Sequence, residues 1–78
     1  MNFQYTRKRG EKRTYDVTVR MIRSHGGPFD YQASIYHGDD FKGQRTGSPL
    51  TALDLDSAMM EAREFIEQDI EDLVGVME

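Results

Sequence analysis

The alternation of apolar and polar residues in "RTYDVTVRMIRS", positions 13–24, constrains the fold of this chain more than any other feature. Successive side chains of a strand point to opposite faces, so a period of two predicts a half-buried β-strand. "HGGPFD" then supplies two glycines and a proline for a turn, and "FDYQASIYH" resumes the alternation. The two segments predict an antiparallel hairpin. Its apolar face would consist of Tyr15, Val17, Val19, Met21, Phe29, Tyr31, Ala33 and Ile35.

The segments on either side of this hairpin carry weaker patterns. "NFQYTRK" alternates through Phe3 and Tyr5 and is followed by the turn sequence "RGEK", which predicts a further strand at one edge of the sheet. "GDDFKGQRTGSPL", positions 38–50, is rich in glycine and contains a proline. It therefore predicts a loop with at most one short strand, over 41–45.

From position 51 the apolar residues recur every three or four positions, which predicts an amphipathic helix. Three starts are open: a capping box from Thr51 to Asp54, or a cap at Asp54 or at Asp56. Gly75 is the expected stop. The apolar stripe comprises Leu55, Met59, Ala62, Ile66, Ile70, Leu73 and Met77, widened by Ala58, Phe65 and Val74.

These elements predict a single α+β domain spanning 1–78, because 78 residues leave no room for a second core. An antiparallel sheet of three to four strands would be covered on one face by a single C-terminal helix. The other face would be left to solvent or to a partner. Its expected residues are Thr14, Asp16, Thr18, Arg20, Gln32 and Ser34.

The residue types present argue against most kinds of catalytic site and metal site. The chain has no cysteine, which excludes disulfides, thiolate metal sites and cysteine nucleophiles. His25 and His37 lack the spacing of metal ligands, and the serines lack the context of a hydrolase nucleophile. We therefore expect no enzymatic activity, no metal and no cofactor. No apolar run approaches the roughly 20 residues of a membrane span, so a cytoplasmic protein without membrane contact is expected.

Charge is distributed unevenly along the chain. Residues 1–23 carry a net charge of +5, whereas the remainder carries −9. Carboxylates crowd the last turns of the expected helix, where the helix dipole favours cations. We expect this uncompensated acidic face to bind a basic surface of a larger protein or nucleoprotein complex. The expected partner-binding residues are Glu61, Glu64, Glu67, Glu71 and Asp72 on the helix, with Asp39 and Asp40 in the loop before it.

The basic tract "TRKRGEKR", positions 6–13, supports a different class of function. A small nucleic-acid-binding regulator would use cationic side chains against phosphates. Its residues would be Arg7, Lys8, Arg9, Lys12, Arg13 and Arg20. We favour instead the tip of an edge hairpin whose charge protects the edge or offsets the helix. A third alternative is a structural homodimer that buries the open sheet face or a strand edge.

The order of these segments, ending in "LDLDSAMMEAREFI", resembles small strand-strand-strand-helix proteins of phages, mobile elements and proteobacteria, some of which are anti-CRISPR inhibitors. The resemblance covers most of the chain. It implies stoichiometric binding to a larger protein machine, often through acidic surface that competes with a nucleic acid. The leading prediction is therefore a non-enzymatic protein-binding module, in its narrower form a phage-type inhibitor acting in the host cytoplasm.

Overall fold

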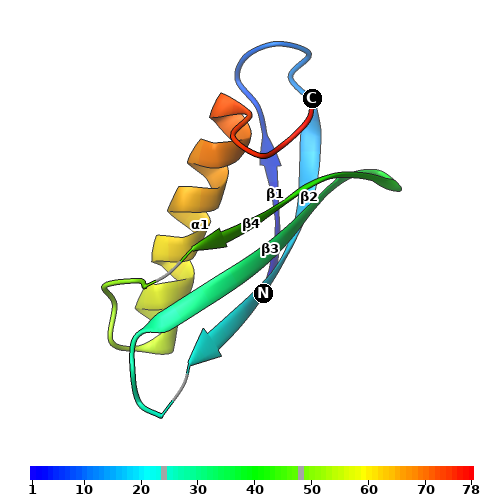
Figure 1. Cartoon of the computed structure of the whole chain (residues 1–78). Coiled ribbons are helices and arrows are strands. Elements are labelled where there is room, and N and C mark those ends of the chain that lie inside the picture. Colours follow the sequence, from blue (N-terminus) through cyan, green and yellow to red (C-terminus); the bar gives the residue numbers. More distant parts are fainter. Residues whose placement is uncertain (24, 48) are drawn as a thin grey trace.

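Four strands and one helix make up the described part of the chain, residues 1–23, 25–47 and 49–78 of a computed structural model (Figure 1). The elements are β1 (Asn2–Thr6), β2 (Thr14–Arg23), β3 (Phe29–His37), β4 (Asp40–Gly47) and α1 (Leu55–Asp72). The strands form an antiparallel meander in the order β1-β2-β3-β4, and α1 lies on one face of it. The predicted α+β arrangement is confirmed. Ser24 and Ser48, in the expected strand and loop segments, lie outside the described residues.

The buried face of the sheet follows the alternation seen in the sequence. Val17 pairs with Ile35 and Val19 with Ala33 across β2 and β3, and all four side chains are buried. Such cross-strand pairs stabilise a sheet when the same face is also covered by another element. The cover comes from α1, whose buried residues are Ala58, Ala62, Ile66 and Ile70.

Of the three expected helix starts, the structure shows the one capped by Asp54. Its carboxylate accepts a hydrogen bond from the Ser57 backbone N–H at 3.0 Å, as an N-cap does. The helix ends at Asp72, because Leu73 adopts a left-handed φ of 53°, so it stops before Gly75. Phe65 is 54% exposed and does not widen the buried stripe as expected. No helix within the described ranges combines the length and the apolar composition needed to span a membrane.

The glycine-rich segment after β3 is a strand and not the expected loop. β4 runs from Asp40 to Gly47 and pairs with β3 along its length, with a bulge where Lys42 is the extra residue. His37 pairs with Asp40, which leaves Gly38 and Asp39 as a two-residue turn. Gly38 has a φ of 60°, as the first central position of a type II′ hairpin turn requires.

The C-terminal tail covers part of the outer edge of β4. Val76 bridges to Gly43, and the Met77 backbone N–H donates to the Lys42 carbonyl oxygen at 2.8 Å. A Cβ atom at Gly43 would lie 2.1 Å from the Gly75 carbonyl oxygen, so the close approach of tail and strand requires glycine there. One edge of the sheet is therefore partly paired by the chain itself.

We expect Ile66→Ala to lower the free energy of unfolding by about 2–5 kcal/mol, because Ile66 is fully buried and its removal leaves a cavity. Phe65→Ala, at the adjacent and exposed position, should change it by less than about 1 kcal/mol. Urea denaturation followed by circular dichroism measures both. Equal losses at the two positions would contradict the packing of α1 described above.

Candidate partner-binding surfaces

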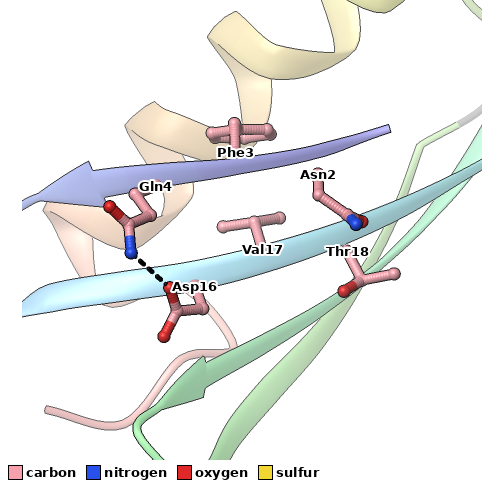
Figure 2. A pocket seen from close by; sticks show the side chains of 6 residues that line it. All are labelled: Asn2, Phe3, Gln4, Asp16, Val17 and Thr18. Carbon is pink, nitrogen blue, oxygen red and sulfur yellow. Dashed lines mark hydrogen bonds between the residues drawn. The ribbon is translucent and has the colours of Figure 1, made fainter.

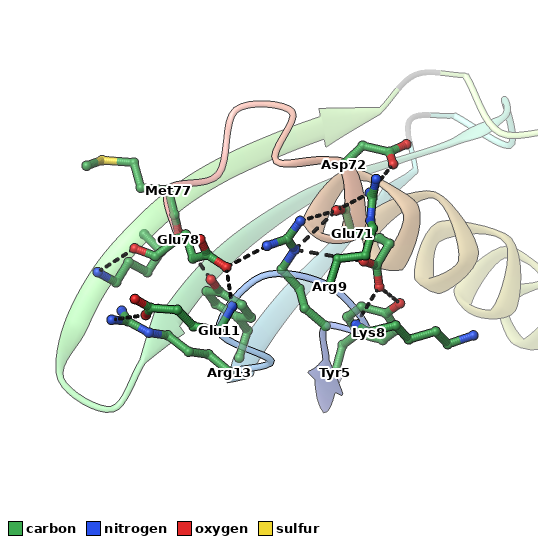
Figure 3. Close-up of polar contacts among 12 residues, drawn as sticks. Tyr5, Lys8, Arg9, Glu11, Arg13, Glu71, Asp72, Met77 and Glu78 are labelled. Carbon is green, nitrogen blue, oxygen red and sulfur yellow. Dashed lines mark hydrogen bonds and ion pairs between the residues drawn. The ribbon is translucent and has the colours of Figure 1, made fainter.

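The basic tract folds back over the C-terminal end of α1 (Figure 3). Arg7 is only 6% exposed, and its Nε and Nη2 atoms donate to the Glu71 carbonyl oxygen at 3.1 and 2.7 Å. Its Nη1 atom donates to the Glu78 carboxylate at 2.7 Å. Arg9 donates to the same Glu71 carbonyl and to the Glu71 and Asp72 carboxylates, at 2.5, 2.9 and 2.7 Å. The two guanidinium groups thus cap the negative end of the helix dipole.

Glu71 is the hub of this arrangement. Its Oε1 atom accepts hydrogen bonds from the Tyr5 hydroxyl at 2.7 Å and from the Lys8 backbone N–H at 2.9 Å. The Tyr5 hydrogen bond, the Lys8 N–H and Arg9 together lower the pKa of Glu71 to about 2. The same hydrogen bond to Glu71 is the main cause that raises the pKa of Tyr5 to about 12. We call Tyr5, Arg7, Arg9, Glu71 and Asp72 the helix-end cluster.

The helix-end cluster corrects the expectation of uncompensated acid at the end of the helix. The Glu71 side chain is 13% exposed, and both Glu71 and Asp72 are paired with Arg9. The basic tract therefore neutralises the carboxylates that it was expected to leave free. Its role as a counterweight to the helix is confirmed for Arg7 and Arg9.

The other predicted acidic residues are divided between α1 and the β3–β4 turn, and most of those on α1 are bonded within the chain. Glu61 accepts hydrogen bonds from the backbone N–H and the hydroxyl of Thr51, and Glu67 pairs with Arg63 at 3.0 Å. Glu64 is exposed and makes no polar contact with any residue that the structure describes. Asp39 and Asp40 are exposed at the turn between β3 and β4, which projects away from α1 (Figure 1).

The predicted basic residues are also separated. Arg7 and Arg9 are bonded to the end of α1, whereas Lys8 and Lys12 beside them are exposed. Arg13 pairs with Glu11 at 2.5 Å. Arg20 lies on the outer face of β2, roughly 20 Å along the strand from its start at Thr14. The fold therefore does not gather the six side chains into one phosphate-binding surface.

The outer face of the sheet carries an exposed aromatic pair that the sequence analysis missed. Tyr36 and Phe41 are cross-strand partners on β3 and β4, and their rings meet edge to face with centroids 5.5 Å apart. Phe41 is 57% exposed. Asp16 is paired with Tyr36 in the same row of the sheet, and the exposed Asp39 and Asp40 precede Phe41. We call Tyr36 and Phe41 the aromatic corner.

The signal for the aromatic corner was present in "YHGDDF". A glycine followed by one polar residue favours a two-residue type II′ turn, and such a turn brings the flanking residues opposite each other. The alternation of "FDYQASIYH" places Tyr36 on the outer face. Interpreted as a hairpin, the segment predicts that Phe41 lies beside it.

An open hollow of about 350 Å³ lies over β1 and β2 (Figure 2). Within it the Gln4 side-chain amide donates to the Asp16 carboxylate at 2.7 Å. No cluster of three metal-ligating side chains is found within residues 1–23, 25–47 and 49–78, and His37 Nδ1 instead lies 3.1 Å from the Thr14 carbonyl oxygen. The residues that line the hollow are Asn2, Phe3, Gln4, Asp16, Val17 and Thr18.

No protein-family model, curated protein or solved structure matches the chain. The resemblance to phage and mobile-element proteins therefore stays a prediction. The surfaces described above are the basis for the function proposed below.

We expect Arg7→Met to lower the free energy of unfolding by about 2–4 kcal/mol, because it keeps the buried alkyl stem but removes the charge-assisted hydrogen bonds to the Glu71 carbonyl and the Glu78 carboxylate. Lys8→Met is the matched control, since the Lys8 side chain is exposed. It should change stability by less than about 0.5 kcal/mol. Thermal and urea unfolding measure both variants, and a neutral Arg7→Met would contradict the structural role of this arginine.

We expect Tyr5→Phe to raise the pKa of Glu71 from about 2 toward its ordinary 4.5, because the Tyr5 hydrogen bond is the largest cause of the depression. A depressed carboxyl pKa stabilises the fold above pH 4.5, and this stability is lost as the pH falls toward 2. The variant should therefore show a shallower loss of stability across that window.

An NMR titration of the Glu71 carboxyl carbon measures the shift directly. Tyr36→Phe removes a hydroxyl from the other face of the sheet and should leave the Glu71 pKa unchanged. If Tyr5→Phe also left the pKa near 2, the Tyr5 hydrogen bond would not be its main cause.

Proposed function

We propose that this chain is a non-enzymatic protein-binding module that contacts a basic partner surface through the aromatic corner and the carboxylates around it. The observation that carries this proposal is the exposed Tyr36–Phe41 pair on a sheet face that no described residue covers. Aromatic side chains are enriched among residues that dominate binding energy, because they bury much area at little cost in side-chain entropy.

The surroundings of the aromatic corner resemble the polar rim of a protein interface. Along the same face, β2, β3 and β4 present the uncharged polar side chains of Thr18, Gln32, Ser34, Gln44 and Thr46. Amides and hydroxyls of this kind adapt their hydrogen bonds to a partner, and a face poor in lysine and glutamate loses little on desolvation. The face thus suits a protein partner better than the acidic helix, whose carboxylates are largely paired.

The charge beside the aromatic corner indicates the chemistry of the partner. Asp16 lies beside Tyr36 in the same row of the sheet, and Asp39 lies in the turn that leads to Phe41. An arginine can pair with a carboxylate and stack on an aromatic ring at the same time, which a lysine does less well. The partner surface is therefore basic and rich in arginine, as a nucleic-acid-binding surface is. Blocking such a surface would be the action of a phage-type inhibitor.

We expect Phe41→Ser to weaken partner binding by about 30-fold or more, the loss typical of a central aromatic residue. Phe65→Ser is the matched control, since Phe65 is about equally exposed but lies on α1. Partners are recovered from the source cells by photo-crosslinking through benzoylphenylalanine at position 41 or 65, and the affinity of each variant is then measured by calorimetry.

Crosslinking from position 41 but not from position 65, together with weak binding by Phe41→Ser alone, is the expected result. Asp39→Asn with Asp40→Asn should slow association and reduce its dependence on salt, because these charges steer a basic partner. Both serine variants should keep the wild-type unfolding temperature. Loss of binding only in Phe65→Ser would place the interface on α1 and overturn the proposal.

A further inference from the structure

Among the residues that the structure describes, none pairs with the outer edge of β1. The Val19 backbone N–H donates to the Met1 carbonyl oxygen at 2.7 Å, which sets the alternation of the ladder between β1 and β2. By this alternation Phe3 and Tyr5 bond to β2, whereas Asn2, Gln4 and Thr6 direct their backbone N–H and C=O groups outward. No other strand or loop in the described ranges pairs with these groups.

The sequence of β1 has none of the features by which proteins protect such an edge. "NFQYT" contains no charge, proline or glycine, and its pairing with β2 is continuous without a bulge. An edge of this kind is a template for another strand. The opposite edge, on β4, is partly covered by the tail through Val76 and Met77. The two edges therefore differ, and only that of β1 is open along its whole length.

We propose that a second copy of this chain occupies the β1 edge, with the two β1 strands antiparallel and Gln4 opposite its counterpart. The result is one continuous sheet across two chains, with both helices on the same face. This register is self-complementary: Asn2 lies opposite the second copy's Thr6, and Phe3 lies opposite the second copy's Tyr5. Amide, hydroxyl and aromatic pairs of this kind stabilise neighbouring strands. The hollow beside Asn2 and Gln4 leaves room for the second copy's amides on the outer face.

The charges over the inner face support the same register. The Arg63 guanidinium lies 4.6 Å from the centre of the Phe3 ring, and Tyr5 is bonded to Glu71. Because two-fold pairing brings Phe3 beside the second copy's Tyr5, Arg63 faces the second copy's Glu71 end of the helix. Both charges are already paired within each chain, so what this register adds is the Tyr5 ring of one copy beside the Arg63–Phe3 contact of the other, an arrangement that a strand of unrelated sequence lacks.

Sedimentation velocity on the full chain tests the proposal, over about 1 μM to 1 mM because a strand-pairing interface this short lies at the weak end of the affinity range. The wild type should form dimers as its concentration rises. Gln4→Lys places two like charges opposite each other and should weaken the dimer about tenfold or more. Gln44→Lys introduces the same charge on the same face of β4 and should leave the dimer unchanged.

Mixing two Gln4 variants of opposite charge distinguishes the β1 edge from any other interface. Gln4→Lys and Gln4→Glu should each be monomeric where the wild type is dimeric, and a mixture of the two should form dimers. A wild type that stays monomeric at about 1 mM overturns the proposal. The β1 edge would then be available to a strand from another protein. A dimer that Gln4→Lys and Gln44→Lys affect equally also overturns it, because its interface would not be β1.

Discussion

The capping of α1 by Arg7 and Arg9 holds the two ends of the chain together. Arg7 reaches the Glu71 carbonyl oxygen across 64 positions of sequence, and it does so from the loop that follows an outer strand. Closing so long a segment costs entropy that rises only slowly with length, so a few charge-assisted hydrogen bonds in a partly buried site can offset it. Because the same contacts satisfy helix carbonyls and acidic side chains, the placement of β1 and the end of α1 depend on each other.

This capping also decides which surfaces are free. The helix-end cluster uses several of the charges that are most prominent in the sequence, so Arg7 and Glu71 are engaged within the chain and are not free to hold a partner. Charge that appears unbalanced along a chain can be balanced in three dimensions. What remains exposed is less conspicuous in the sequence: a polar sheet face with two aromatic rings, and an uncharged strand edge.

The part of the fold that depends on local pattern could be predicted, and the part that depends on long-range pairing could not. Alternation places Val17 and Val19 inside, and the helical period does the same for Ile66 and Ile70, because both periods are properties of the backbone. The pairing of Arg7 with Glu71 follows from tertiary geometry that no sequence period encodes. The position of Phe41 is an intermediate case. A two-residue turn recognised at Gly38 would have predicted that Phe41 pairs with Tyr36.

The aromatic corner and the β1 edge can be occupied at the same time, and their positions determine how a dimer would present the aromatic corners. The aromatic corner lies on β3 and β4, whereas the proposed dimer forms through β1 at the other side of the sheet. A dimer would therefore present two aromatic corners on one continuous face, about six strand spacings or roughly 30 Å apart. A partner with repeated basic sites at that spacing would engage both corners, and the second contact would form at high effective concentration. Weak binding at each corner would then add up to stable capture without a large interface on either chain.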